Sequence, residues 1–284
     1  MSDRPSLDSE IAAHYALGLE QGRLFDGGEG LEFVRSCDLL SRYLPPAPAE
    51  VLDVGGGPGA YANWLARRGY RVHLIDPAHL HVEQARAAAV AQPDHPFTAA
   101  VGDARRLEEG DRTFDAVLLF GPLYHLTERA DRLSALREAR RVRRPGGTVL
   151  AVGISRFASL LDGLRRGFLT DPQGRAMVEH DLRDGQHRNP DGRPGWFTTA
   201  FFHHPDDLAA EVVEAGFALD GVLGIEGPGG LLASLWDDPA RRPLVVEAAR
   251  LVEREPSLLG LSFHLMAVGR VATTSDRASR SPRR

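Results

Sequence analysis

The sequence predicts an α/β fold in which helices cover both faces of a mostly parallel β-sheet. Short apolar stretches alternate with longer stretches whose apolar residues recur at helical spacing. Residues 114–120 are nearly all apolar, as expected for a strand buried on both faces. The chain of 284 residues is also long enough to bury the core of one large α/β domain with added elements.

The central unit is expected over residues 49–153, and its parallel strands are expected at 51–54, 71–76, 97–101, 114–120 and 148–154. Its helices are expected at 58–68, 78–92 and 127–144. The turn Pro145-Gly146-Gly147 leads into the fifth strand. Ligands of open α/β sheets bind outside the carboxyl ends of the strands, so this edge holds the first candidate residues.

The first strand runs into a glycine-rich turn, Val-Leu-Asp-Val-Gly-Gly-Gly-Pro-Gly-Ala at 51–60. Glycine lets the backbone turn sharply at a strand end and approach a ligand closely. The helix that follows directs its amide-rich end to the same spot, which suits a carboxylate or phosphate. An ordinary strand–helix turn is the alternative. The candidate cofactor-binding residues here are Gly55, Gly56, Gly57 and Gly59.

Acidic residues mark the ends of three strands. Asp76-Pro77 closes the second strand and is placed to bind a ribose diol. Asp103 and Ala104, after the third strand, offer an acid and a backbone amide to an adenine edge. Asp53 precedes the glycines, where a carboxylate would repel a pyrophosphate but suit a ligand that carries an ammonium and a sulfonium group. The dinucleotide pattern G-x-G-x-x-G/A can still be placed on this turn.

These motifs have the order and spacing of the class I S-adenosylmethionine-dependent methyltransferases, which the chain resembles over about residues 49–153. The resemblance rests on 51–59, Asp76, Val101-Gly102-Asp103-Ala104 and the turn at 145–147. It implies a Rossmann-like seven-stranded sheet, mostly parallel with an antiparallel last strand, a helical N-terminal cap and inserted lid elements. It also implies S-adenosyl-L-methionine as cofactor and S-adenosyl-L-homocysteine as product. An NAD(P)-dependent oxidoreductase and a non-catalytic regulatory module that binds S-adenosylmethionine remain alternatives.

Residues 1–48 are predicted to form the helical cap. Ile11, Tyr15 and Leu19 recur at four-residue steps, and prolines end a second helix near Leu44. In related methyltransferases such a segment lies over the cofactor, so the resemblance suggests that Tyr15 and Arg23 lie near the methionine moiety. A core aromatic residue and a solvated charge are the respective alternatives.

The stretch after the fourth strand, Phe-Gly-Pro-Leu-Tyr-His at 120–125, determines the chemistry. Phe120 and Gly121 fall at the cofactor edge. His125 is expected near the transferred methyl group, where a neutral imidazole can act as general base, with Tyr124 as its companion. Structural roles are the alternative for both. Methyltransferases that act on nucleic-acid amino groups share an Asn or Asp at the position that Gly121 occupies here. The glycine therefore disfavours that substrate class.

Inserted elements are expected after the fifth strand. Residues 154–204 form a cap or lid, with a helix at 156–169 and a polar loop at 171–195. Residues 205–271 complete the sheet, with a helical insertion at 228–256, and 272–284 form a disordered tail. Three residues of these elements are tentative substrate contacts: His187, His203 and Glu226. A metal is not expected, because consecutive histidines in a strand point to opposite faces.

Composition narrows the function further. The net charge of −5 argues against binding to nucleic acid or an anionic membrane. The two insertions around the last hairpin resemble those of small-molecule methyltransferases, and this resemblance implies a small-molecule substrate. All 34 basic residues are arginine, so no lysine can serve as a base or form a Schiff base. Cys37 is the only cysteine, and no stretch approaches a membrane span. We therefore expect a cytoplasmic protein and leave a homodimer open.

Overall fold

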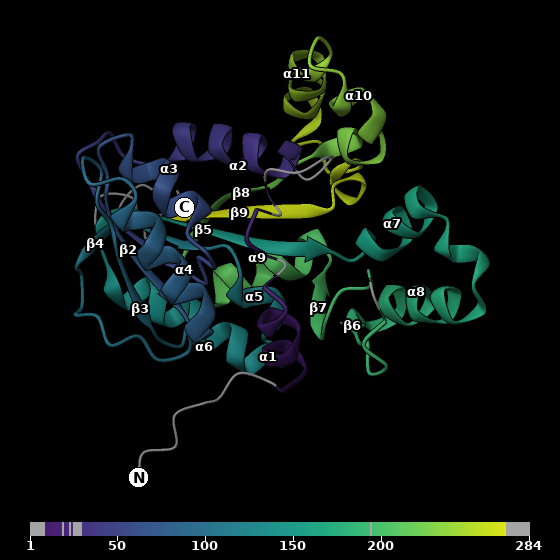
Figure 1. Ribbon diagram of the computed structural model, residues 1–284, viewed down its shortest axis with the longest axis horizontal. Helices are drawn as coiled ribbons and strands as arrows, with labels where there is room; N and C mark the ends of the chain where they lie inside the picture. Colours follow the sequence, from purple (N-terminus) through teal and green to yellow (C-terminus); the bar gives the residue numbers. More distant parts are fainter. Residues whose placement is uncertain (1–8, 19, 23, 25–29, 194, 271–284) are drawn as a thin grey trace, which may run out of the picture.

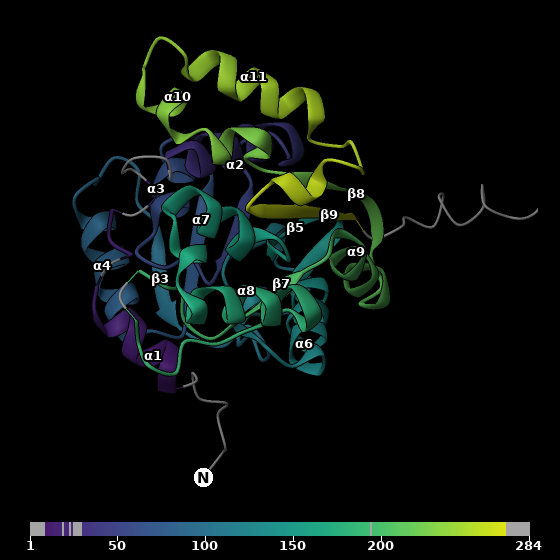
Figure 2. The ribbon, with the colours of Figure 1, turned by 90° about the vertical axis from the view of Figure 1, so that its right-hand side faces the viewer.

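A computed structural model describes residues 9–18, 20–22, 24, 30–193 and 195–270. It confirms the α/β class: helices cover both faces of one mixed sheet (Figures 1 and 2). The strands are β1 Glu50–Val54, β2 Arg71–Asp76, β3 Thr98–Val101, β4 Phe114–Leu119, β5 Arg143–Ser155, β6 Gln186–His187, β7 Ala200–His203, β8 Ala218–Gly224 and β9 His264–Arg270. The α-helices are α1 Ser9–Ala16, α2 Gly30–Tyr43, α3 Ala60–Ala66, α4 His79–Val90, α5 Pro122–His125, α6 Arg129–Val142, α7 Ala158–Arg166, α8 Pro172–Asp184, α9 Pro205–Glu214, α10 Ala233–Asp237 and α11 Arg242–Val252. Short 3₁₀ turns lie at Phe168–Thr170, Gly227–Leu231 and Leu259–Leu261.

Five parallel strands form the sheet in the order β3-β2-β1-β4-β5. Strand β9 pairs antiparallel with β5, and β8 pairs antiparallel with β9, which confirms the expected direction of the last strand. The inserted segment adds β6 and β7, so the sheet has nine strands within the described residues, instead of the expected seven. Strand β7 pairs with β5 at Ile154 and Ser155, beyond the point where β4 ends. The insertion therefore extends the sheet directly beside α5.

Side chains alternate between two cores, as the pleat of a strand requires. Leu118 of β4 points to one face, where it packs with residues of α2 and α3 such as Leu40 and Leu65. Val117 and Leu119 point to the opposite face and pack with α6 and α9. The strand is thus buried on both sides, which explains its almost uniformly apolar sequence. In Figure 1, α10 and α11 lie outside α2, and α7 and α8 project from the end of the sheet.

The predicted loop at 171–195 is wrong in its first half, because residues 172–184 form α8. The side chain of Asp171 accepts the Gln173 N–H at 3.0 Å, and Pro172 occupies the first turn. Gly185 ends the helix with a φ of 76°. These start and stop signals were present in the sequence. The mostly polar composition concealed the helix, which buries Val178 and Asp181 on its inner side.

Two predicted boundaries near the sheet also shift. Helix α3 begins at Ala60 instead of residue 58, because the glycine turn continues through Gly59, whose φ is 92°. Residues 145–147 lie within the range of β5, where the pairing between β4 and β5 shifts, and Gly146 has the positive φ of 80° that a turn needs.

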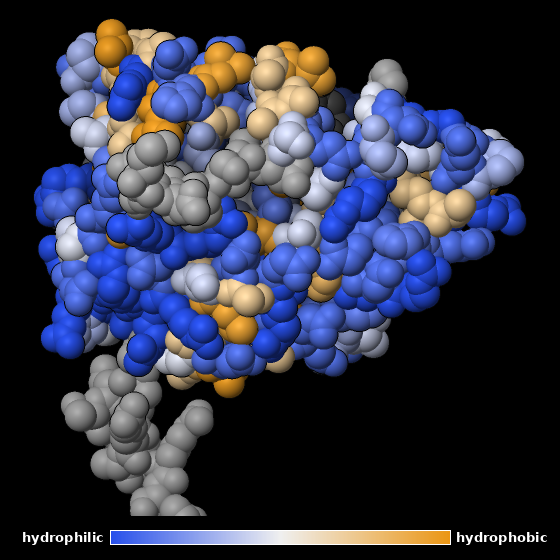
Figure 3. Space-filling model, turned by 90° about the horizontal axis from the view of Figure 1, so that it is seen from below, coloured by the Kyte–Doolittle hydropathy of each residue, from blue (hydrophilic) through white to orange (hydrophobic). Residues whose placement is uncertain are grey.

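Among the described residues, no helix is both long and apolar enough to cross a bilayer. The face of the molecule shown in Figure 3 is mostly hydrophilic, with a few small hydrophobic patches. The predicted tail at 272–284 lies outside the residues that the structure describes.

Candidate active site

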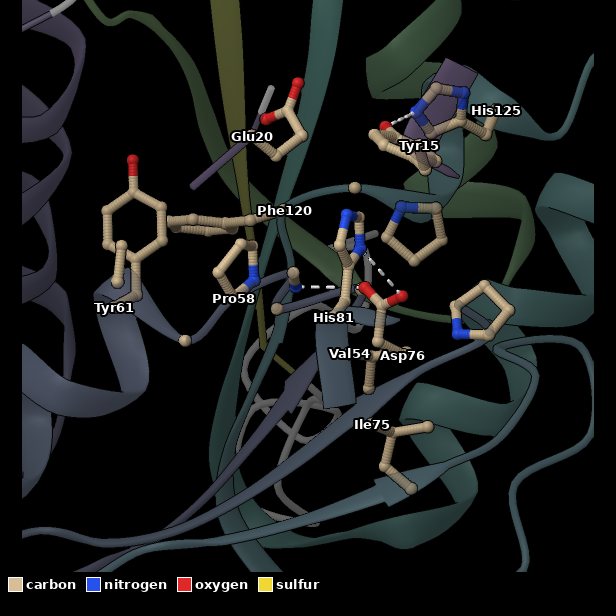
Figure 4. A pocket seen from close by; sticks show the side chains of 18 of the residues that line it. Tyr15, Glu20, Val54, Pro58, Tyr61, Ile75, Asp76, His81, Phe120 and His125 are labelled. Atoms are coloured by element: carbon tan, nitrogen blue, oxygen red, sulfur yellow. Dashed lines mark hydrogen bonds and ion pairs between the residues drawn. The ribbon is translucent and has the colours of Figure 1, made fainter. Parts of the chain in front are cut away.

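A cavity of about 1120 Å³ opens at the carboxyl ends of β1–β4, between the loops that follow these strands and α1. Figure 4 shows Tyr61 and Phe120 on one side of it and Tyr15 and His125 on the other, with His81 and Asp76 between. The cavity lining includes most of the residues that the sequence nominated: Tyr15, Gly55, Gly56, Gly57, Gly59, Asp76, Pro77, Asp103, Ala104, Phe120, Gly121, Tyr124 and His125. Arg23 lies outside the described residues.

The glycine turn brings the ends of β1 and β4 into close contact. A Cβ atom on Gly55, whose φ is 73°, would lie 2.6 Å from Cδ of Pro122, and one on Gly121 would lie 2.8 Å from the Gly55 carbonyl oxygen. Gly57 also has a positive φ, 56°, but a Cβ there would meet no atom of the described residues within 4 Å. Within this part of the chain, the outer side of Gly57 therefore faces open space at the cavity, where a ligand can approach the backbone.

Asp76 ties the glycine turn to the end of β2. Its carboxylate accepts the Gly57 and Ala78 backbone N–H groups, both at 2.9 Å, and lies 3.1 Å from Nδ1 of His81 (Figure 4). A carboxylate offers about four acceptor positions, so one remains for a ligand hydroxyl. His81 was not predicted as a site residue; its place in the first turn of α4, five residues after Asp76, was the available signal.

Asp53 does not line the cavity, which corrects its predicted role. Its side chain is completely buried beneath Gly56, where a Cβ atom would lie 2.7 Å from the Asp53 Oδ2 atom. Within the part of the chain that the structure describes, neither carboxylate oxygen has a hydrogen-bond partner. Burial, and to a lesser extent the charge of Asp76, raise the pKa of Asp53 to about 7. The expectation failed because the pleat directs this side chain under the turn and away from the cavity.

Asp103 is held by an arginine that sequence reasoning missed. Nε of Arg105 donates to Oδ1 of Asp103 at 2.9 Å, and its terminal nitrogen donates to Oδ2 at 2.6 Å. Arg105 also binds Asp131 at 2.9 Å, and all three residues line the cavity. An arginine two residues after an acid in a tight turn was the signal.

His125 ends α5 and is bonded on both sides of its ring. Its Nδ1 lies 3.4 Å from the Thr199 carbonyl oxygen, and its Nε2 is hydrogen-bonded to the Tyr15 hydroxyl. The protein surroundings of the ring remove solvent and lower its pKa to about 4, so the imidazole is neutral at neutral pH. The neighbouring Tyr124 hydroxyl donates to the Phe120 carbonyl at 2.9 Å.

Two of the tentative substrate residues are absent from the cavity lining, which is given for the described part of the chain. His187 is buried, with its Nδ1 2.8 Å from Asp181 and its ring stacked on Phe202. His203 is fully buried and lies 3.4 Å from Glu211, and burial lowers its pKa. His187 ends β6, and His203 ends β7, whose four residues are all buried, so both histidines are packed inside the fold.

Glu226, the third tentative substrate residue, is also absent from that lining. It is 4% exposed and accepts hydrogen bonds from the Ser262 hydroxyl and the His264 backbone N–H, at 2.7 and 3.0 Å. Burial would raise its pKa, but His264 and these hydrogen bonds outweigh burial and lower it. Glu32, Glu226 and His264 place possible metal-ligand atoms within 4.8 Å of one another. The predicted absence of a metal stays a prediction.

Comparisons with known proteins agree with this geometry. Residues 51–147 match the family described as "Methyltransferase domain". A ubiquinone biosynthesis O-methyltransferase from Xanthomonas axonopodis pv. citri is 30% identical over 207 residues, which cover 72% of this chain and 74% of the relative. A ubiquinone/menaquinone biosynthesis C-methyltransferase from Caulobacter vibrioides is 34% identical over 128 residues, covering 42% of this chain and 50% of the relative.

The fold is also similar to solved structures. An S-adenosylmethionine-dependent methyltransferase from Methanosarcina mazei superposes with a TM-score of 0.57 at 18% identity, over 83% of this chain and 98% of that protein. The antiparallel strand β9, the glycine turn and Asp76 stand where the resemblance in the sequence placed them. The oxidoreductase and the non-catalytic module are thereby set aside. The chain belongs to the class I S-adenosylmethionine-dependent methyltransferases, and S-adenosylmethionine is its cofactor.

Proposed function

We propose that the protein transfers the methyl group of S-adenosylmethionine to a hydroxyl group of a small molecule bound beneath α1. The observation that carries this proposal is the size of the cavity. Pockets for single drug-sized ligands measure about 300–1,000 Å³, and the cavity of about 1120 Å³ exceeds that range. It has room for the cofactor together with a second small molecule. Stacked aromatic rings, such as Phe33 and Tyr61 with centroids 5.3 Å apart, give one side of it an apolar surface.

The residues that would hold the cofactor follow from their chemistry. Asp76 retains an acceptor position for the ribose hydroxyls, and Gly57 leaves its backbone open to the methionine end. Asp103 and Ala104 are the candidates for the adenine edge. Arg105 holds the Asp103 carboxylate in one orientation, which favours a single way of binding the base.

Two observations favour a hydroxyl oxygen as the methyl acceptor: the kind of methyltransferase that the chain matches over most of its length, and a histidine that can act as base. The relative with the larger coverage is an O-methyltransferase, whereas the C-methyltransferase matches half of its own length. When bound, the cofactor supplies an electrophilic methyl group. His125 is the candidate base, because its low pKa keeps the ring neutral and able to accept the hydroxyl proton. Tyr124 keeps a lining role, since its hydroxyl donates to the carbonyl of Phe120, the residue that follows β4.

The test is transfer of label from methyl-labelled S-adenosylmethionine into a bacterial lysate that has been separated into small-molecule, protein and nucleic-acid fractions. We expect label in the small-molecule fraction, and none with an Asp76→Ala variant run in parallel. Label in the protein or nucleic-acid fraction alone would refute the proposed acceptor class. The homodimer and the cytoplasmic location stay predictions; light scattering of the purified protein tests the first.

A further inference from the structure

We infer that Tyr15 and His125 form a two-step proton relay in which the Tyr15 hydroxyl contacts the acceptor and His125 takes up the proton behind it. This inference rests on the proposed function, because it names the group that deprotonates the acceptor hydroxyl. It changes the expected role of both residues. Tyr15 becomes the catalytic residue instead of a cofactor contact, and His125 becomes the positioned base that acts through Tyr15.

The hydrogen bonds fix the direction of the relay. The Thr199 carbonyl can only accept, so Nδ1 of His125 must carry the hydrogen that points to it. The neutral ring then has its lone pair on Nε2. The Tyr15 hydroxyl is the partner of Nε2 and must therefore donate to it (Figure 4). The phenol oxygen keeps lone pairs that can accept a proton from another molecule.

The base itself is covered by aromatic side chains. The rings of Tyr15, Tyr124 and Phe197 lie 5.2, 4.8 and 5.6 Å from the His125 ring, centroid to centroid. Tyr15 occupies the Nε2 side and Thr199 the Nδ1 side. An acceptor that approached Nε2 directly would have to displace the Tyr15 hydroxyl. An acceptor that meets the phenol oxygen leaves the hydrogen bond between Tyr15 and His125 intact.

Helix α1 is held so that Tyr15 lies between the base and the end of β2. The Thr199 hydroxyl is bonded to Glu10, and the ring of His14 lies 5.8 Å from that of Phe197. The ring of Tyr15 also lies 4.6 Å from that of His81, which is bonded to Asp76. His81 therefore links the Tyr15 ring to the carboxylate that we assign to the ribose.

The relay balances protons and electrons. The acceptor hydroxyl gives its proton to the Tyr15 oxygen while Tyr15 gives its own proton to Nε2 of His125. The acceptor oxygen uses the freed electron pair to form the bond to the methyl carbon, and the electron pair of the broken carbon–sulfur bond stays on sulfur. Burial has the largest effect on the resulting imidazolium and disfavours it. The charges of Glu20 and Asp76 partly offset burial, and His14 adds to it. It returns the proton through Tyr15 to water after the product leaves.

Tyr15→Phe separates this relay from direct catalysis by His125. The rate to follow is label transfer to the small-molecule fraction at saturating labelled cofactor. Loss of general acid–base catalysis costs about 10²–10⁴-fold, and we expect at least a 100-fold fall for both Tyr15→Phe and His125→Gln. Tyr70→Phe removes a hydroxyl that donates to Pro45 at 2.9 Å, away from the cavity lining, and serves as the control with an unchanged rate.

Two readouts that do not depend on turnover accompany the rates. Calorimetry with S-adenosylhomocysteine should give the same affinity for Tyr15→Phe and the wild type, within a factor of three. In ¹⁵N NMR spectra, wild-type His125 should be neutral with its hydrogen on Nδ1, and Tyr15→Phe should shift the Nε2 resonance as its hydrogen bond is lost.

A wild-type protein that labels small molecules together with an equally fast Tyr15→Phe variant would overturn the relay and leave the proposed function intact. Tyr15→Phe as fast as the wild type beside a slow His125→Gln would identify His125 as the direct base. Failure of the wild type to label any small molecule would instead refute the proposed function.

Discussion

Asp53 and Asp76 stand near the same end of the neighbouring strands β1 and β2, and the Gly57 N–H of the glycine turn donates to Asp76. The Asp76 carboxylate accepts two backbone N–H groups, whereas both oxygens of Asp53 are buried without a partner among the described residues. The cost of burying an unpaired charge appears in the pKa of Asp53, which rises to about 7. The sequence predicts a cofactor contact for each acid, but in the structure only Asp76 lines the cavity, and the charged form of Asp53 is unfavourable.

Asp53 should make the protein less stable as the pH rises. Its pKa is 3.8 in the ordinary state and about 7 in the folded protein, so the native state holds a proton that the unfolded chain releases. Stability is then lost between about pH 4 and pH 7, by about 4 kcal/mol in total. The measurement is urea unfolding of the wild type and Asp53→Asn at pH 5, 6, 7 and 8.

The difference between these two proteins isolates Asp53. His125 has a lowered pKa and contributes the opposite slope, with stability lost as the pH falls from 6.5 towards 4, but it does so equally in both proteins. We expect the free energy of unfolding of Asp53→Asn to increase relative to that of the wild type as the pH rises from 5 to about 7. A constant difference across this range would show that Asp53 is ionised in the folded protein at pH 5.

Asp76→Asn should weaken both the turn and cofactor binding. An amide has one acceptor oxygen, so its NH₂ group must face either the Gly57 or the Ala78 N–H, and one buried donor loses its partner. We expect a loss of about 1–3 kcal/mol in the free energy of unfolding and at least a tenfold weaker affinity for S-adenosylhomocysteine by calorimetry.

Asp115→Asn is the matched control for this variant. Asp115 also accepts a backbone N–H, that of Glu50 at 2.9 Å, but it is not part of the cavity lining. It should lose stability and keep its cofactor affinity. Equal affinities of the Asp76→Asn variant and the wild type would contradict the assignment of Asp76 to the ribose.

Gly57→Ala should reduce cofactor affinity more than stability. Gly55 and Gly57 both have positive φ, so alanine costs about 1–2 kcal/mol at either position. A Cβ on Gly55 would in addition lie 2.6 Å from Pro122, whereas one on Gly57 would occupy open space at the cavity. We expect Gly55→Ala to lower the urea midpoint further than Gly57→Ala. Unaltered binding of S-adenosylhomocysteine by Gly57→Ala would place the cofactor elsewhere.

Arg132→Met should lower the free energy of unfolding, because it breaks a buried ion pair between α6 and α9. Arg132 is buried, donates to Glu211 at 2.8 Å and also donates to the carbonyls of Leu126 and Thr127, which follow His125. Burial would raise the pKa of Glu211, but hydrogen bonds from His203 and Arg132 lower it to about 2, so it stays charged. Breaking a buried pair costs about 3–5 kcal/mol, which urea unfolding measures.

Two further variants give reference values for the stability that Arg132→Met loses. Arg241→Met, which breaks an exposed pair with Asp238, should cost less than about 1 kcal/mol. Removing both buried charges in Arg132→Met/Glu211→Leu should recover part of the stability, because no unpaired charge remains. A single Arg132→Met variant as stable as Arg241→Met would show that the pair contributes nothing.

The sequence was sufficient for the sheet and most of the cofactor edge because both depend on local signals. Glycines in a strand–helix turn and acids at strand ends are recognisable without knowledge of their neighbours. Asp53 shows the limit of this reasoning, since the side to which it points depends on the pleat and on Gly56 packing over it. The spacing of Arg105 from Asp103 and of His81 from Asp76 was visible in the sequence, but the hydrogen bonds between them depend on how the chain turns after each strand.

The inserted segment was predicted less well, because the partners of its polar side chains depend on how its elements pack. A place in a lid predicts that His187 and His203 contact the substrate, but Asp181 and Glu211 bind them inside the fold. The hydrogen bond between Tyr15 and His125 joins residues 110 positions apart, so no local sequence pattern predicts it. Helix α8 was concealed by its polar composition, although its capping residues were visible.

The most direct test of the account is a crystal structure of the protein with S-adenosylhomocysteine. We expect the ribose hydroxyls at Asp76, the amino acid end along the open side of Gly57, and the sulfur atom directed towards Tyr15 and His125. A ligand whose sulfur pointed away from this pair, towards Tyr61 and Phe120, would contradict the proposed site of methyl transfer.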